Sequence, residues 1–312
     1  MGHHVVVTGV LIGFTIIAAI IGVGYVIGRV DLLGPHAQPI IARLVFFVLS
    51  PCLLFTVLAD ATVSQLFSPL LAVSLIAAVV SFVLFGVVAL ALWRRSLPEA
   101  IIGALAAGYV NANNIGLPVA VYVLGDPAYS APVILLQLLL FAPVALAVLD
   151  AKTGGRASLG QVLSQPFRNP IIIGSALGLA LTLTNIELPD AAMEPFRIIG
   201  GAAVPLMLIS YGMSLNGQKI LQAGSGRRDV LLASGLKLAV MPGLAALVGH
   251  LWFGLSGQEL FAVVALAALP TAQNVFNYAQ RYGRGVILAR DTILITTVGS
   301  LPVLMVVAAV LH

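Results

Sequence analysis

The chain is dominated by apolar stretches of about 20 residues that carry almost no charge. We read ten such stretches, at about 6–28, 37–58, 69–93, 98–124, 130–149, 170–186, 194–214, 229–253, 259–281 and 290–311. An α-helix of this length crosses a bilayer core of roughly 30 Å. The apolar residues are continuous rather than alternating, which indicates membrane helices and not β-barrel strands. We therefore predict an all-α membrane protein with ten transmembrane helices.

Charge is scarce along the whole chain. Only 8% of the 312 residues are charged, whereas a soluble domain carries about 25%. The net charge of +4 is spread over short segments without a dense basic patch, so nucleic acid is not expected as a partner. The sequence contains no His-Glu-x-x-His, Gly-x-Ser-x-Gly or phosphate-binding loop motif. We expect no enzyme activity, no cofactor and no metal ion.

The chain repeats itself weakly at long range. Four residues recur 154 positions later, in the pairs Gly24 and Gly178, Pro35 and Pro189, Arg43 and Arg197, and Pro51 and Pro205. Three more recur 160 positions later, in the pairs Glu99 and Glu259, Ala112 and Ala272, and Asn114 and Asn274. Five spans in each copy make an odd number, so the second copy enters the membrane in the opposite orientation. We predict two inverted five-helix repeats at 1–150 and 170–312, joined by a cytoplasmic linker at 151–169.

Basic residues indicate how the spans are oriented. Twelve of the fifteen Lys and Arg residues fall in the odd-numbered loops, and the even-numbered loops contain acids instead. The positive-inside rule then places the odd-numbered loops in the cytoplasm and both termini outside. We expect a multi-pass protein of the inner membrane, with membrane lipid around it.

Two of the predicted spans contain polar sequences that a lipid-facing helix would not favour. The fourth contains Asn111-Ala112-Asn113-Asn114-Ile115-Gly116-Leu117-Pro118, and the ninth contains Pro270-Thr271-Ala272-Gln273-Asn274-Val275-Phe276-Asn277. Gly116 loosens the backbone, while Pro118 and Pro270 remove backbone donors. Freed backbone groups in a membrane require protein or a wet cavity beside them. We predict that both helices break at these residues and cross near the midplane, which indicates the binding site of a secondary transporter.

The side chains at the predicted breaks indicate the kind of ligand. Six amides lie there, namely Asn111, Asn113, Asn114, Gln273, Asn274 and Asn277. Neither polar stretch contains Asp or Glu, although membrane sites for sodium ions or protons normally include a carboxylate. Amide groups and helix N-termini suit an organic anion. Two alternatives stay open: the amide oxygens could contribute to a sodium site, or the polar residues could only hold two kinked helices to their neighbours.

Three basic residues lie inside predicted spans: Arg43, Arg197 and Lys237. Each could extend to the nearest lipid headgroups. Arg43 and Arg197 are repeat counterparts and could instead form ion pairs or a charge relay for an anion on either side of the site. Lys237 has no counterpart in the first repeat, so it could attract an anion or titrate during transport. The sequence does not choose between these interpretations.

The two broken-helix motifs, the ten spans and the outward termini together resemble the auxin efflux carrier family. The resemblance extends over nearly the whole chain, and it is closest to compact bacterial members called malate or malonate permeases. Plant PIN proteins of the same family have a long central loop, which this chain replaces by about twenty residues. The resemblance implies a fold like those of the bile-acid sodium symporters and NhaA.

This resemblance also implies a mechanism. Spans 1, 2, 6 and 7 would form a scaffold, and spans 3–5 and 8–10 a transport domain that moves like an elevator within a homodimer. Asn114 and Asn274 would contact a substrate carboxylate, and Pro118 and Pro270 would mark the crossing. We expect a secondary-active or facilitative carrier of small organic anions such as malate, malonate or auxin-like acids. The alternatives are a sodium-coupled symporter and a membrane sensor that transports nothing.

Overall fold

The described part of the chain folds entirely into helices. The computed structural model describes residues 2–60, 68–153, 170–184, 186, 188–217 and 226–311, and their only β-type pairing is one isolated bridge. Most of the predicted linker, residues 154–169, lies outside the described residues. The prediction of an all-α protein is therefore confirmed for the described part of the chain.

Helical segments occupy each of the ten ranges read from the sequence, with ends shifted by a few residues. The first half contains α1 (Gly2–Arg29), α2 (Ala37–Leu44), α3 (Ser50–Ala59), α5 (Pro69–Val87), α6 (Leu97–Gly108), α7 (Leu117–Val119), α8 (Ala131–Leu136) and α9 (Ala142–Thr153). The second contains α11 (Pro170–Thr184), α12 (Asp190–Gly201), α13 (Ala203–Ser214), α14 (Arg227–Gly235), α15 (Met241–Phe253), α16 (Gly257–Ala267), α17 (Gln273–Tyr282) and α18 (Val286–Leu311). Short π-helical turns join several of them without a break, such as Val45–Leu49 between α2 and α3.

Six of the described helical runs are long and apolar enough to cross a membrane. They are Ala37–Ala59, Pro69–Leu92, Pro127–Lys152, Asp190–Ser214, Arg227–Phe253 and Val286–Leu311. Shorter apolar helices occupy the remaining predicted spans, among them the two pieces of the fourth span, Leu97–Gly108 and Ala112–Leu124. The chain is thus a multi-pass membrane protein, and the ten-span inverted topology stays a prediction.

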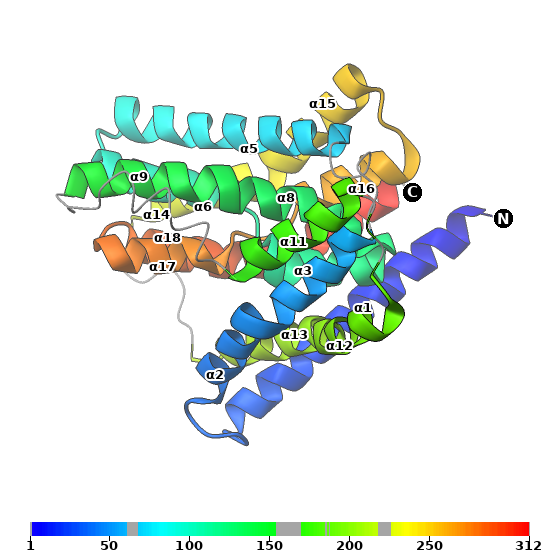
Figure 1. Cartoon of the computed structure of the whole chain (residues 1–312). Coiled ribbons are helices and arrows are strands. Elements are labelled where there is room, and N and C mark those ends of the chain that lie inside the picture. Colours follow the sequence, from blue (N-terminus) through cyan, green and yellow to red (C-terminus); the bar gives the residue numbers. More distant parts are fainter. Residues whose placement is uncertain are drawn as a thin grey trace.

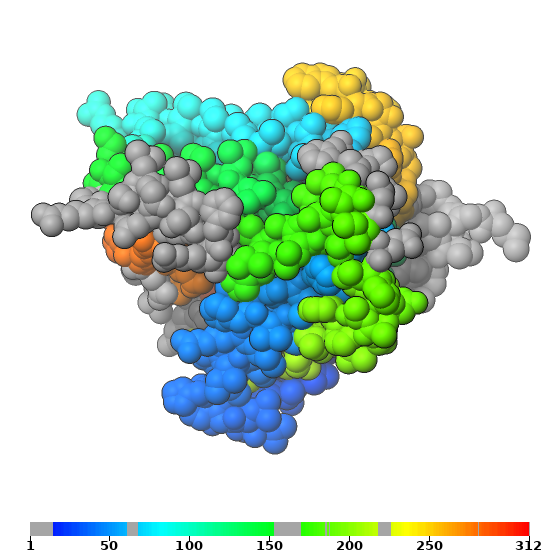
Figure 2. Space-filling model, in the orientation of Figure 1, coloured from blue at the N-terminus to red at the C-terminus, as the bar shows by residue number. Residues whose placement is uncertain are grey.

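Close helix contacts at glycine join the two halves of the chain. A Cβ atom on Gly24 of α1 would lie 2.2 Å from the carbonyl oxygen of Ile209 in α13. A Cβ atom on Gly178 of α11 would lie 2.4 Å from the carbonyl oxygen of Phe55 in α3. Figure 1 shows α1 beside α13, and α3 beside α11 and α12, whereas α5, α6, α9, α14, α17 and α18 form a second group of helices. Figure 2 shows the α2–α3 segment and the α11–α12 segment next to one another on the surface.

The second group also contains α16, and most residues of α6 and α16 are buried. Every residue of α16 from Leu260 to Ala267 is buried. The start of α6 is capped, because the Glu99 carboxylate accepts hydrogen bonds from the Ser96 amide at 3.2 Å and the Ser96 hydroxyl at 2.9 Å. Both helices then run inward and end at a break.

Candidate functional site

Both helices predicted to break are broken. The first helix ends at Gly108 and helical structure resumes at Ala112, while the second ends at Ala267 and resumes at Gln273. Pro270 lies within the second break, as the sequence predicted.

The first break lies earlier in the chain than Gly116 and Pro118, where the sequence placed it. Both residues belong to the helical run that resumes at Ala112, with Gly116 at the end of its π-helical turn and Pro118 in α7, so the run continues through Pro118 although proline has no backbone donor. Gly116 has a different effect: a Cβ atom there would lie 2.9 Å from a methyl group of Leu269 in the other break. Gly116 therefore allows the two breaks to approach one another.

The two breaks pair through their backbones. Val110 and Thr271 form an antiparallel bridge. The Asn111 amide donates to the Pro270 carbonyl at 2.8 Å, and the Ala272 amide donates to the Tyr109 carbonyl at 3.0 Å. Each unpaired backbone group would cost several kcal/mol in a bilayer, so this pairing makes an interrupted helix tolerable there. Broken helices thus meet at one point, as the sequence predicted.

Side chains of the second break and of neighbouring helices form hydrogen bonds with the other backbone groups at this crossing. The Thr271 hydroxyl donates to the Ala106 carbonyl at 2.6 Å, and the Thr271 amide donates to the Thr296 hydroxyl at 3.1 Å. The Gln137 amide donates to the Val110 carbonyl at 2.9 Å. Gln137 and Thr296 come from the fifth and tenth predicted spans, so the neighbouring helices complete the hydrogen bonding of the breaks.

Lys237 lies in the π-helical turn Leu236–Val240 between α14 and α15. Its side chain points to the end of α16 and does not extend to the membrane surface. Its side chain is fully buried, and its amine donates to the Ala267 carbonyl at 2.6 Å and contacts the Met241 sulfur at 3.1 Å. Ala267 is the last residue of α16, where unpaired carbonyl groups carry partial negative charge. A basic group there offsets that charge. Lys237 does not belong to the lining of the cavity described below.

Replacing Lys237 by methionine should lower the thermal stability of the purified protein. The change keeps most of the side-chain volume but leaves the Ala267 carbonyl without its donor, and such a buried group costs about 1–3 kcal/mol. The matched control is Ser234→Ala in α14, because the Ser234 hydroxyl is buried without a partner. Equal melting temperatures for Lys237→Met and Ser234→Ala would show that the contact with Ala267 adds no stability.

A cavity of about 440 Å³ opens beside the crossing. All six predicted amides line it: Asn111, Asn113, Asn114, Gln273, Asn274 and Asn277. Sequence reasoning missed the other polar lining residues, which are Tyr109, Gln137, Ser210, Tyr211 and Tyr278. Tyr109 and Tyr278 directly flank the two motifs and could have been found by extending them. Gln137, Ser210 and Tyr211 come from other helices, and nothing in the sequence connects them with the breaks.

Two polar side-chain atoms at the cavity have no hydrogen-bond partner among the described residues. Asn111 accepts from the Asn114 backbone at 3.2 Å through its carbonyl oxygen, so its amide nitrogen is left as a buried donor without a hydrogen bond. Asn113 donates to the Asn114 carbonyl oxygen at 3.1 Å, and its own oxygen is buried and unpaired. The Tyr109 hydroxyl is likewise buried and lies beside the side chains of Asn274 and Tyr278. Unsatisfied buried groups of this kind are rare in folded proteins, and at the wall of a cavity a bound water or ligand can supply the missing partner.

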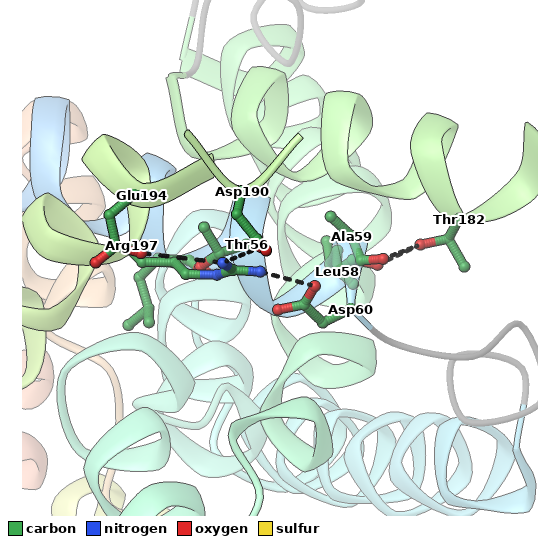
Figure 3. A network of polar contacts seen from close by, with 9 residues as sticks. Thr56, Leu58, Ala59, Asp60, Thr182, Asp190, Glu194 and Arg197 are labelled. Atoms are coloured by element: carbon green, nitrogen blue, oxygen red, sulfur yellow. Dashed lines mark hydrogen bonds and ion pairs between the residues drawn. The ribbon is translucent and has the colours of Figure 1, made fainter. Parts of the chain in front are cut away.

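The two arginines of the repeat have different surroundings. Arg43 lines the cavity, whereas Arg197 lies among carboxylates outside it. Arg197 contacts Asp190 at 3.1 Å, Asp60 at 3.9 Å and Glu194 at 4.0 Å, as Figure 3 shows. Of the three interpretations weighed for Arg197, namely lipid headgroups, an ion pair and a charge relay, these contacts support the ion pair.

An all-helical membrane chain with two interrupted helices joined at a polar cavity has the architecture of a membrane transporter. The chain belongs to the membrane transport protein family, whose profile matches residues 10–158 and 152–308. This is the family of the auxin efflux carriers, so the resemblance seen in the sequence is confirmed.

Three relatives illustrate the range of the family. A Rhizobium meliloti protein named as a malonate transporter is 27% identical over 300 residues, which cover 93% of this chain and 91% of that protein. An uncharacterized transporter of Methanothermobacter thermautotrophicus is 27% identical over 284 residues, which cover 89% of this chain and 90% of that protein. A rice protein named auxin efflux carrier component 5b is 33% identical over 150 residues, which cover 46% of this chain and 40% of that protein.

Proposed function

We propose that this transporter carries small organic anions and binds their carboxylate at the crossing of the two broken helices. The observation that carries the proposal is the amide-lined cavity, where the buried amide nitrogen of Asn111 has no hydrogen-bond partner among the described residues. No Asp or Glu is among the described residues that line it. An anion with several acceptor oxygens satisfies such donors, and no fixed negative charge repels it.

The N-terminal ends of two helices also favour an anion in the cavity. Gln273 and Asn274 are the first residues of α17, and Asn113 and Asn114 lie in the first turn after the other break. All four line the cavity, so two helix N-termini face it. Each N-terminus carries roughly +0.5 charge from its unpaired amides. A carboxylate bound there gains both hydrogen bonds and electrostatic stabilisation.

An elevator movement within two inverted repeats accounts for the arrangement of the helices. In the first repeat α1 packs closely on α13 at Gly24, and in the second α11 packs closely on α3 at Gly178. Each contact pairs one half of the chain with the other, as expected of a scaffold made from spans 1, 2, 6 and 7. The remaining spans would move with the crossing. We further propose a homodimer in the inner membrane, with both termini outside.

Sodium coupling is the main alternative, because Asn113 and Gln273, whose side chains carry amide oxygens that can bind a cation, line the cavity. The contacts of Lys237 speak against it. Its amine already occupies the carbonyl at the end of α16, which is the kind of group that would otherwise bind a cation. We therefore favour a facilitative carrier, and this assignment needs no cofactor.

Counterflow exchange in proteoliposomes tests the proposal. Vesicles loaded with unlabelled malate or malonate are expected to take up the labelled anion faster than empty vesicles, because a carrier exchanges internal for external substrate. Uptake should persist when choline replaces sodium on both sides. No exchange with any small carboxylate would refute the proposed function and leave a membrane sensor as the alternative, and exchange that stops without sodium would indicate the symporter.

A further inference from the structure

We propose that the site selects small dicarboxylates, with one carboxylate at the crossing and the second paired with the guanidinium group of Arg43. This inference rests on the proposed function, because it assumes that the first carboxylate binds the amides of the crossing. It adds a residue that determines specificity and narrows the substrate class from organic anions to diacids.

Arg43 differs from every other described residue that lines the cavity, because it alone carries a charge. It belongs to α2, which is separate from both broken helices. Its side chain is exposed, and no ion pair or hydrogen bond joins it to another described residue. Arginine remains protonated in proteins, so the cavity holds a permanent positive charge without a counter-ion among its described lining residues.

Arg197 has carboxylate partners, whereas Arg43 has none among the described residues, and this difference suggests that a ligand pairs with Arg43. The two residues occupy equivalent places in the repeat, yet Arg197 contacts three carboxylates within 4.0 Å. An arginine within a membrane-spanning helix normally pairs with an acid or extends to headgroups. Arg43 instead lines the cavity, where a carboxylate of the cargo would supply the missing partner.

Two separate anion-binding features fit a diacid better than a monoacid. Amides and helix N-termini bind one carboxylate at the crossing, and the planar guanidinium group of Arg43 can bind another through two parallel hydrogen bonds. A monocarboxylate would leave one of the two features unpaired. A volume of about 440 Å³ lies within the range of small-molecule sites and accommodates a short diacid with water.

The test compares diacids with their half-esters, which have the same carbon chain but one negative charge. Uptake of malonate and succinate and of their monomethyl esters is measured in proteoliposomes. We expect wild-type protein to prefer each diacid at least about tenfold, as one lost charged contact is worth at least one decade in affinity. Arg43→Gln should lower diacid uptake about tenfold and change half-ester uptake less than about twofold. Arg43→Lys should give an intermediate preference, because lysine cannot form the bidentate contact.

Arg197→Gln is the matched control, since it removes the repeat counterpart outside the cavity and should keep the wild-type preference. All variants are first checked for monodisperse folding in detergent. If Arg43→Gln lowers both substrates equally or neither of them, the assignment of Arg43 is wrong and the proposed function still stands. If folded wild-type protein moves no carboxylate at all, the proposed function itself fails and this inference with it.

Discussion

Replacing Asn274 by alanine is expected to abolish carboxylate transport while the protein still folds. Asn274 lies at the start of α17 and lines the cavity, where its amide can donate to a substrate carboxylate. A hydrogen bond to a charged group contributes about 1.5–3 kcal/mol, which corresponds to a loss of roughly 10- to 100-fold in binding. The same result is expected for Asn114→Ala, whose amide contacts Gln273 at 3.5 Å across the crossing. Counterflow exchange measures both variants.

A control variant must remove an amide without touching the cavity. Gln258→Ala does so, because its side chain donates to the Leu124 carbonyl at 3.1 Å and is not among the lining residues. This variant should transport at the wild-type rate. Wild-type exchange by both Asn114→Ala and Asn274→Ala would mean that the substrate binds elsewhere.

Gly24→Ala is expected to destabilise the protein strongly. The added methyl group would lie 2.2 Å from the backbone oxygen of Ile209 and 2.8 Å from its Cα atom, so α1 and α13 would have to separate. Overpacking of this kind costs about 1–3 kcal/mol, and a fixed backbone neighbour places Gly24 at the upper end. The melting temperature in detergent and the yield of monodisperse protein measure the effect.

Gly22→Ala provides the comparison two residues away in the same helix. A Cβ atom at Gly22 would have no neighbour within 4 Å, and alanine favours a helix over glycine by about 0.5–1 kcal/mol. Gly22→Ala should therefore be neutral or slightly stabilising. Similar melting temperatures for the two variants would contradict the close packing of α1 on α13.

Sequence reasoning located the breaks because their signal is local. Three asparagines beside a glycine and a proline are unfavourable in an ordinary lipid-facing helix, and the structure breaks the helix at the start of each motif. The exact place of the first break could not be predicted in this way. Pro118 disfavours the helix before it, yet here the helical run from Ala112 continues through it, and pairing with Pro270 holds the break at residues 109–111.

The surroundings of the three basic residues inside predicted spans, Arg43, Arg197 and Lys237, could not be predicted from the sequence either. Arg43 and Arg197 have the same spacing to the following proline, and only tertiary packing brings Asp60 to one of them and the cavity to the other. Lys237 likewise depends on a helix 30 residues further along the chain, whose last carbonyl it binds. Local patterns predict which residues are unusual, and long-range packing decides what each of them contacts.

The unequal surroundings of Arg43 and Arg197 have a consequence for the kinetics of the carrier. If Arg43 meets the cargo on one side of the bilayer and Arg197, which lies outside the cavity, does not take its place on the other, half-saturation will occur at different concentrations on the two sides. This difference in half-saturation makes the rate of transport at a given substrate concentration differ between the two directions. It cannot move cargo uphill, because detailed balance fixes the same final gradient whatever the two affinities are.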